Sequence, residues 1–255
     1  MCPYLFHGTP YELITWDVCC WTGVIVGSIF GLFIIKPKDF KLSLKVRLIV
    51  TLGLVVVGML GGRLVHIFLN LSRIMKDPNY LIHALLNGPS ASLGTLFFDI
   101  IFIMVLKRKI AKNIGYLQAL DFAIPILYLQ LIFIRIGCFF NGCCSGALTK
   151  VPWGFKFNGS HVARHPTQLY SIIALVLAIF MTIKIYRKDF PAGTAFFSSI
   201  ALYSFFRFFI ELLRVDSFKV FNNITFAPLF MSVFFIFSLL GLILNLRSKN
   251  GKPVH

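Results

Sequence analysis

The sequence predicts an all-α, polytopic membrane protein with about seven transmembrane helices. Of its 255 residues, 58% are hydrophobic and only 13% are charged, and the mean hydropathy is +0.83. A helix of roughly 20 residues crosses a hydrocarbon core of about 30 Å, and apolar stretches near that length recur along the chain. These stretches lie near residues 13–35, 48–70, 91–106, 117–140, 168–186, 193–213 and 225–246.

The basic residues lie in short clusters between the apolar stretches. Clusters of Lys and Arg follow the first, third, fifth and seventh stretches, all on one predicted side of the membrane. By the positive-inside rule, the N-terminus is then outside and the C-terminus cytoplasmic. The formal net charge of +16 is therefore interpreted as a topology signal and predicts no nucleic-acid partner. We treat 1–255 as a single domain with an external loop over about 141–166.

Three arginines lie within the apolar stretches, each toward the predicted outer end of its helix: Arg63, Arg135 and Arg207. An ionisable side chain at membrane depth requires a partner or a wet cavity. One acid lies near them, so the surplus positive charge favours binding of an anion. Guanidinium groups bind phosphate in a bidentate manner, and the abundant anion in an outer-leaflet cavity is a phospholipid headgroup.

The helix expected at 193–213 carries four polar residues on one face: Tyr203, Arg207, Glu211 and Arg214. In the simplest interpretation, Arg207 and Glu211 neutralise each other at i, i+4, and Arg214 extends to the interface. In the alternative, the same residues belong to the anion site. Earlier in the chain, Asp121 stands near the start of its own helix, where a carboxylate complements the helix dipole.

Two histidines are candidates for chemistry. His66 follows Arg63 by three residues on the same helical face, and is either a packed, hydrogen-bonded residue or a general base. His165 precedes Pro166, which marks the start of a helix, and it either binds substrate or orients the loop.

Three cysteines lie close together in the sequence: Cys138, Cys143 and Cys144. Their spacing matches no zinc pattern with two separated ligand pairs. We therefore expect small-residue packing or a loop disulfide, and no metal.

Several ordered motifs resemble the prolipoprotein diacylglyceryl transferase family of bacterial inner-membrane enzymes. The resemblance runs from about Gly53 to the C-terminus and includes the segment 135–146, the segment 164–170 with the letters RHPTQLY, and the helix that carries Arg207, Glu211 and Arg214. It implies transfer of the diacylglyceryl group from phosphatidylglycerol to the lipobox cysteine thiol in the signal-peptide region of a prolipoprotein. No metal or soluble cofactor is implied.

The resemblance also implies roles for individual residues. Arg135 and Arg207 correspond to the family's essential pair, and Asn141, Gly142 and Gly146 retain the turn of its signature. Further substrate-binding residues are expected at Arg63, His165, Glu211 and Arg214.

The chain departs from the family at the acceptor side. Cys138 and Cys143 replace the Asn and Glu of the signature, and Ser92 occupies the position of the family's candidate base, a histidine. Because serine at its ordinary pKa does not deprotonate a thiol, His66 or Tyr203 is expected to substitute. The alternative function is a homologue that binds anionic phospholipid without catalysis or with another acceptor.

Overall fold

The computed structural model describes most of the chain. The described residues are 4–5, 13–34, 43–77, 80–81, 92–109, 115–157, 160–188, 190–214, 219–221 and 224–248. The helices are α1 (Thr15–Ile29) with a π-helical continuation (Phe30–Ile34), α2 (Leu44–Leu69), α3 (Leu71–Lys76), α5 (Ser92–Lys109), α6 (Tyr116–Asn141), α7 (Thr167–Tyr186), α8 (Thr194–Leu212) and α9 (Phe226–Ser248). Two short antiparallel hairpins pair β1 (Tyr4–Leu5) with β2 (Leu13–Ile14) and β3 (Lys219–Phe221) with β4 (Ile224–Thr225).

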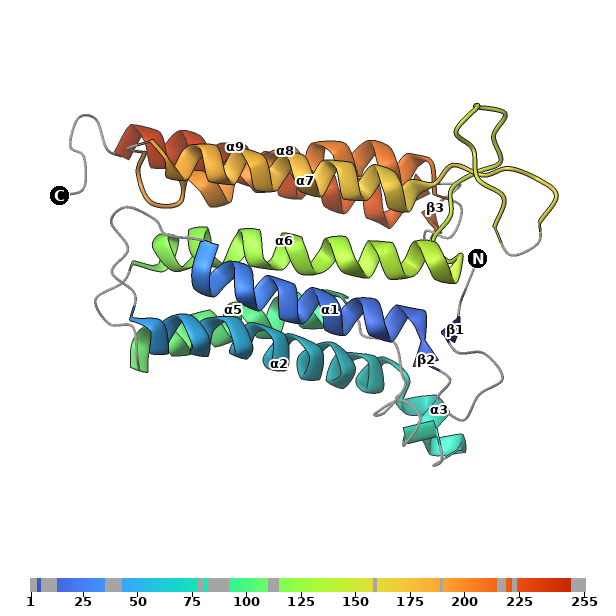
Figure 1. The fold of residues 1–255 in the computed structure, drawn as a ribbon, viewed down its shortest axis with the longest axis horizontal. Coiled ribbons are helices and arrows are strands. Elements are labelled where there is room, and N and C mark those ends of the chain that lie inside the picture. Colours follow the sequence, from blue (N-terminus) through green and yellow to red (C-terminus); the bar gives the residue numbers. More distant parts are fainter. Residues whose placement is uncertain are drawn as a thin grey trace.

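The long helices run nearly side by side, and α6 occupies the middle of the bundle (Figure 1). On one side α7 packs against α6, α8 against α7, and α9 against α8; on the other side α1 packs against α6, and α2 pairs with α5. The connection between α6 and α7 extends from the same end of the bundle as β1, whereas α9 ends at the opposite end. A chain that crosses the membrane an odd number of times, such as the predicted seven, begins and ends on opposite sides, as β1 and the end of α9 do here.

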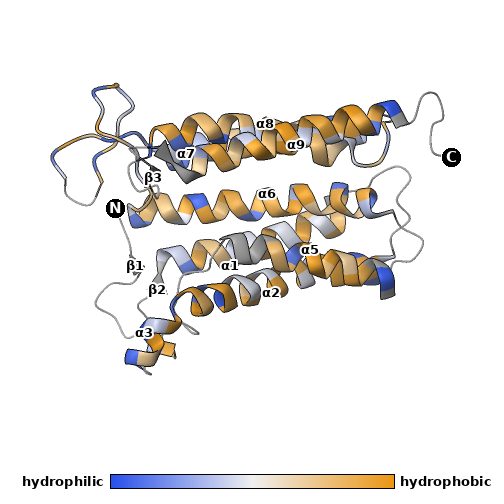
Figure 2. Cartoon of the chain, turned by 180° about the vertical axis from the view of Figure 1, so that it is seen from behind, coloured by the Kyte–Doolittle hydropathy of each residue, from blue (hydrophilic) through white to orange (hydrophobic). Residues whose placement is uncertain are grey.

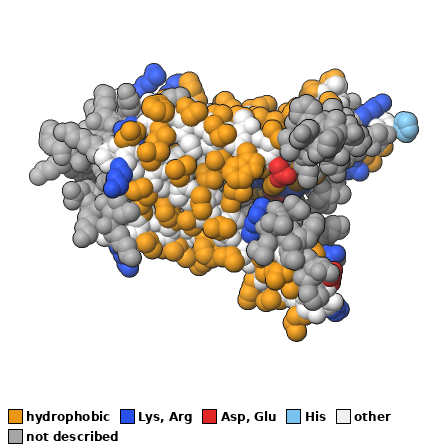
Figure 3. All heavy atoms as spheres, turned by 60° about the horizontal axis from the view of Figure 1, so that its bottom comes forward, with side chains coloured by type: hydrophobic (Ala, Val, Ile, Leu, Met, Phe, Trp, Pro, Cys, Tyr) orange, Lys and Arg blue, Asp and Glu red, His pale blue; other side chains and the backbone are white. Residues whose placement is uncertain are grey.

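Among the residues that the structure describes, six helices are long and apolar enough to cross a membrane, and a shorter apolar helix spans Phe97–Leu106 within α5. Hydrophobic residues predominate along the helices, whereas hydrophilic residues are most frequent toward the helix ends (Figure 2). On the face drawn in Figure 3, most of the visible Lys and Arg side chains lie toward the two ends of the molecule. These features confirm the predicted polytopic, all-helical membrane fold, with α5 as the short third helix. The orientation, with the N-terminus outside, stays a prediction.

Small residues allow the paired helices to approach closely. A Cβ at Gly61 of α2 would overlap the ring of Phe98 on α5. Close approach at glycine is typical of membrane helix interfaces, where packing replaces the hydrophobic driving force. Below α6, buried apolar side chains from α2, α5 and α6 form one cluster around Leu54, Ile103 and Ile126.

Asp121 complements the N-terminus of a helix, but not that of its own helix. Its Oδ2 accepts a hydrogen bond from the backbone N–H of Gly193 at 2.6 Å, and its Oδ1 accepts one from Phe196 at 2.7 Å. Asp121 lies five residues past the start of α6, beyond its first turn, so its carboxylate is free to satisfy the unpaired N–H groups at the start of α8. The carboxylate of Asp121 therefore complements the dipole of α8 and not, as expected from the sequence, that of its own helix α6.

Candidate functional site

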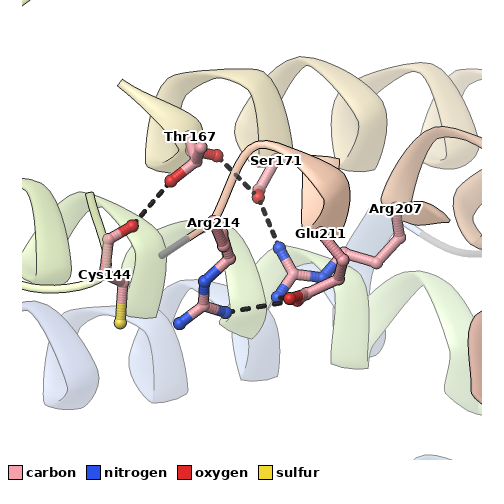
Figure 4. Close-up of polar contacts among 6 residues, drawn as sticks. All are labelled: Cys144, Thr167, Ser171, Arg207, Glu211 and Arg214. Carbon is pink, nitrogen blue, oxygen red and sulfur yellow. Dashed lines mark hydrogen bonds and ion pairs between the residues drawn. The ribbon is translucent and has the colours of Figure 1, made fainter. Parts of the chain in front are cut away.

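The predicted polar face of α8 forms an ion-pair network. Arg207 and Glu211 are 6% and 4% exposed, and they form a salt bridge. The same carboxylate oxygen, Glu211 Oε1, also accepts a hydrogen bond from Arg214 Nη1 at 3.2 Å (Figure 4). The i, i+4 pairing expected from the sequence is therefore confirmed. Arg214 does not simply extend to the interface, because it shares Glu211 with Arg207.

Arg135 of α6 joins this network. The titratable groups close enough to act on its charge include Tyr203, Cys144 and Glu211, and Arg207 in turn lies within reach of Arg135 and Arg214. Counted over the described part of the chain, the structure therefore brings together three arginines and one carboxylate, an excess of two positive charges. Among the described residues, the buried Nε atoms of Arg135 and Arg214 have no hydrogen-bond partner. We call Arg135, Arg207, Arg214 and Glu211 the arginine cluster.

A chain of hydrogen bonds connects the arginine cluster to the loop after α6. Arg207 Nη1 donates to Ser171 Oγ at 3.1 Å, and Ser171 Oγ donates to the carbonyl oxygen of Thr167 at 2.8 Å. Thr167 Oγ1 then donates to the carbonyl oxygen of Cys144 at 2.6 Å (Figure 4). Sequence reasoning missed Ser171 as a partner of Arg207. The signal was the i, i+4 spacing of two small hydroxyl residues on α7, which is common and points to no specific partner.

The turn after α6 depends on two glycines. Asn141 is the last residue of α6, and Gly142 ends the helix with φ 71°, in the left-handed region that glycine adopts without strain. Gly146 is buried where α7 begins and α8 ends, and a Cβ there would lie 2.8 Å from His165 Cβ and 2.9 Å from the carbonyl oxygen of Leu213. Gly142 and Gly146 therefore shape the loop that borders the arginine cluster.

His165 lies on the loop side of this junction. Its Nδ1 is 3.1 Å from the hydroxyl of Tyr170, which also accepts a hydrogen bond from Trp153 Nε1 at 2.8 Å. The His165 backbone completes the connection, since its carbonyl accepts from the Gly146 N–H at 2.9 Å. These contacts agree with the loop-orienting alternative, while substrate binding by His165 stays a prediction.

The two predicted bases occupy different parts of the molecule. His66 lies near the end of α2, where its ring nitrogens are 3.4 Å from the Tyr80 hydroxyl and 3.5 Å from Asn70 Nδ2. Tyr203 lies beside both Arg135 and Arg207. Tyr203 is therefore the predicted base that borders the arginine cluster. His66 has the contacts of the packed, hydrogen-bonded alternative.

Two further predicted residues, Arg63 and Ser92, are described by their positions within helices. Arg63 lies on α2 one turn before His66, and its role in substrate binding stays a prediction. Ser92, which the sequence resemblance predicts to occupy the position of the family's histidine, is the first residue of α5, and its side chain lies outside the described part.

Three cysteines meet at the end of α6. The sulfur atoms of Cys138, Cys143 and Cys144 lie within 4.8 Å of one another, and all three are free thiols. Hydrogen bonds from the thiols of Cys138 and Cys143 lower the pKa of Cys144, and the nearby charges of Arg214 and Arg135 lower it further. The pKa of Cys143 is raised, first by its hydrogen bonds to the other two thiols. We call these three residues the thiol triad.

Comparison of the sequence with known proteins identifies the family. The family model described as prolipoprotein diacylglyceryl transferase matches residues 3–244. A protein of Geobacter sulfurreducens named phosphatidylglycerol–prolipoprotein diacylglyceryl transferase is 33% identical over 76% of this chain and 77% of its own length.

Two further relatives of that name match over shorter segments. The relative from Clostridium tetani is 34% identical over 62% of this chain, and the relative from Pasteurella multocida is 33% identical over 61%. The matches cover 64% and 57% of these two relatives, so the chain spans less than two thirds of their lengths. With a family match over nearly its whole length, the chain belongs to the prolipoprotein diacylglyceryl transferase family.

Proposed function

We propose that this protein transfers the diacylglyceryl group of phosphatidylglycerol to the lipobox cysteine thiol of a prolipoprotein, in the bacterial inner membrane. The names of its relatives support this reaction. The acceptor cysteine belongs to the signal-peptide region of the prolipoprotein, which approaches from the outer face that the positive-inside rule predicts.

The observation that carries the proposal is the excess positive charge of the arginine cluster. Glu211 offsets one of three guanidinium groups, so two charges remain for an anionic substrate. The phosphodiester of phosphatidylglycerol carries one negative charge, and the departing glycerol phosphate gains a second. Donors that face the developing charge stabilise the transition state more than the ground state.

The reaction is a displacement at carbon. The acceptor sulfur forms a C–S bond with the glycerol carbon of the diacylglyceryl group, and the C–O bond to phosphate breaks. The oxygen leaves with the electron pair as glycerol phosphate, which Arg135 and Arg207 hold. The thiol proton must leave before or during the attack, and Tyr203 and His66 are the proposed bases.

The test supplies purified protein with phosphatidylglycerol vesicles and a lipobox peptide, and measures the thioether peptide and the released glycerol phosphate. We expect Arg135→Ala and Arg207→Ala each to lower turnover by about 10²–10³-fold, the typical effect of removing one oxyanion donor. Arg214→Lys, which keeps the charge beside Glu211, is expected to be milder. The exposed Arg247→Ala, at the opposite end of α9, serves as the matched control. Equal tolerance of all four variants contradicts the assignment.

Two variants distinguish between the proposed bases, Tyr203 and His66. Tyr203→Phe removes only the hydroxyl beside the two arginines, and His66→Gln keeps a hydrogen-bonding side chain near Tyr80. Loss of turnover with intact phosphatidylglycerol binding identifies the base. If neither variant loses turnover, neither residue accepts the thiol proton.

The alternative is a homologue that binds anionic phospholipid without transfer. Ser92 at the family's histidine position favours it, because the acceptor side lacks the expected base. Binding of phosphatidylglycerol that depends on Arg135 and Arg207, without any thioether product, would support this alternative and exclude the transferase.

A further inference from the structure

Backbone contacts at the end of α6 place the three cysteines of the thiol triad close together, and these contacts do not involve the thiol groups. Cys138 lies in the last turn of α6 and is buried, while Cys143 and Cys144 follow the Gly142 turn. The backbone N–H of Cys143 donates to the carbonyl oxygen of Cys138 at 3.2 Å. This turn folds the chain back, so that three sulfur atoms from a seven-residue segment share one small volume.

Two buried side chains of α7 fix the loop cysteines. Gln168 Nε2 donates to the carbonyl oxygen of Cys143 at 2.5 Å, and Thr167 Oγ1 donates to that of Cys144 at 2.6 Å. Cys144 has φ 61°, the only positive φ of a residue other than glycine in the described part of the chain. A cysteine in this conformation is strained and persists only when its surroundings impose it. In this conformation the Cys144 sulfur lies within 4.8 Å of the other two sulfurs.

We propose that the thiol triad binds one Zn²⁺ ion, and that the acceptor thiol of the prolipoprotein takes the fourth coordination position. Zinc prefers four tetrahedral ligands, and sites with an open position use three protein ligands. Two sulfurs 2.3 Å from a tetrahedral zinc lie about 3.8 Å apart, so sulfurs within 4.8 Å need to close by at most about 1 Å. The second half of the proposal rests on the proposed transferase function.

The surrounding charges suit such a centre. Zn²⁺ with three thiolates carries one net negative charge, and with the acceptor thiolate two. Arg135 and Arg214 lie close enough to act on Cys144, so the site that would bind phosphate also stabilises the thiolates. A zinc-bound thiol loses its proton to solvent, which removes the need for the family's histidine. The bound thiolate then attacks the glycerol carbon, and the phosphate oxygen departs with the electrons of the broken bond.

This proposal differs from the expectation of simple packing or a loop disulfide. A disulfide joins only two of the three thiols. It does not explain why the third sulfur also lies within 4.8 Å of the other two. The separated ligand pairs of structural zinc sites are also not required, because an open site uses three ligands.

The first measurement is metal content. The purified, reduced full-length protein is loaded with Zn²⁺ in detergent, washed, and compared with Cys138→Ser, Cys143→Ser and Cys144→Ser. We expect one zinc per chain, and a loss of at least tenfold in zinc affinity in each variant. Cys19→Ser on α1, outside the triad, is the matched control and retains the metal. Binding no stronger than in the triad variants, or a disulfide among these cysteines after preparation without reductant, overturns the site.

The second measurement tests the fourth position without requiring turnover. With Co²⁺ in place of zinc, the intensity of the thiolate-to-cobalt charge-transfer band follows the number of Co–S bonds. A lipobox peptide should raise it by about one third, as three sulfur ligands become four, whereas the same peptide with Ser in place of Cys should not. No change with the cysteine peptide overturns the acceptor role. Because this spectrum does not depend on product formation, its result is independent of whether the transferase proposal fails.

Discussion

Replacing Glu211 by glutamine tests whether the arginine cluster is held together by its single carboxylate. Glu211 is 4% exposed and pairs with both Arg207 and Arg214. Glutamine has nearly the same shape, but it removes the negative charge. The variant therefore leaves guanidinium groups in a buried site without their counter-charge.

The expected cost follows from the burial. Breaking a buried pair by removing one partner destabilises a protein by about 3–5 kcal/mol. For a chain of this length, each kcal/mol lowers Tm by about 2–4 °C, so we expect Glu211→Gln to lower Tm by roughly 10 °C. An exposed control with the same charge change, Asp17→Asn, should cost less than about 1 kcal/mol.

The assay is thermal unfolding in detergent, with and without added phosphatidylglycerol. Since the variant raises the excess charge of the arginine cluster from two to three, phosphatidylglycerol should stabilise it more than it stabilises the unmodified protein, relative to the zwitterionic phosphatidylcholine. If Glu211→Gln unfolds within about 2 °C of the unmodified protein, the ion pairs do not hold the cluster. If the lipid effect is unchanged, the cluster is not the phosphate site.

Three other substitutions probe the supports of the site. Asp121→Asn should destabilise the protein by about 1–3 kcal/mol in thermal unfolding, because each carboxylate oxygen accepts from one backbone N–H and the amide NH2 group replaces one of these two acceptors; an unchanged Tm would contradict this. Gly146→Ala should cost about 1–3 kcal/mol of stability and lower transfer, because the added Cβ meets His165 and neighbouring backbone; full activity would show that the loop adjusts. Ser171→Ala removes an acceptor from Arg207 and should weaken phosphatidylglycerol binding by about 2–10-fold in a lipid titration, a loss of roughly 0.5–1.5 kcal/mol, while equal binding would show that Glu211 alone positions Arg207.

Hydropathy predicted most of the fold because lipid imposes it residue by residue. Each span such as α2 or α9 must be long and apolar to cross the hydrocarbon core, so its signal is local. The exception is α5, the third of the predicted spans, whose described apolar segment is the shorter Phe97–Leu106. Hydropathy along the sequence does not predict which helices pack against one another. The central position of α6 depends on packing between side chains far apart in sequence.

In the site, too, contacts between residues close in sequence could be predicted, whereas contacts between residues far apart in sequence could not. The Arg207–Glu211 pair follows from i, i+4 geometry on one helix, whereas the family resemblance, and no spacing rule, associated Arg135 with Arg207. The hydrogen bond from Arg207 to Ser171 joins residues 36 apart, and that from Thr167 to Cys144 joins residues 23 apart. Short hydroxyl side chains bond to many partners, so no spacing rule selects these.

The arginine cluster and the thiol triad share one junction, where α6 ends, α7 begins and α8 ends. Thr167 binds the carbonyl of Cys144 and, through Ser171, connects to Arg207, while Arg214 and Arg135 act on the Cys144 thiol. Both halves of the proposed transfer require a concentration of negative charge, a phosphate on one side and thiolates on the other. One set of guanidinium groups at this junction can stabilise both. In the proposed transfer, the thiol triad therefore lies beside the guanidinium groups that would hold the departing phosphate, where the acceptor thiol would be activated.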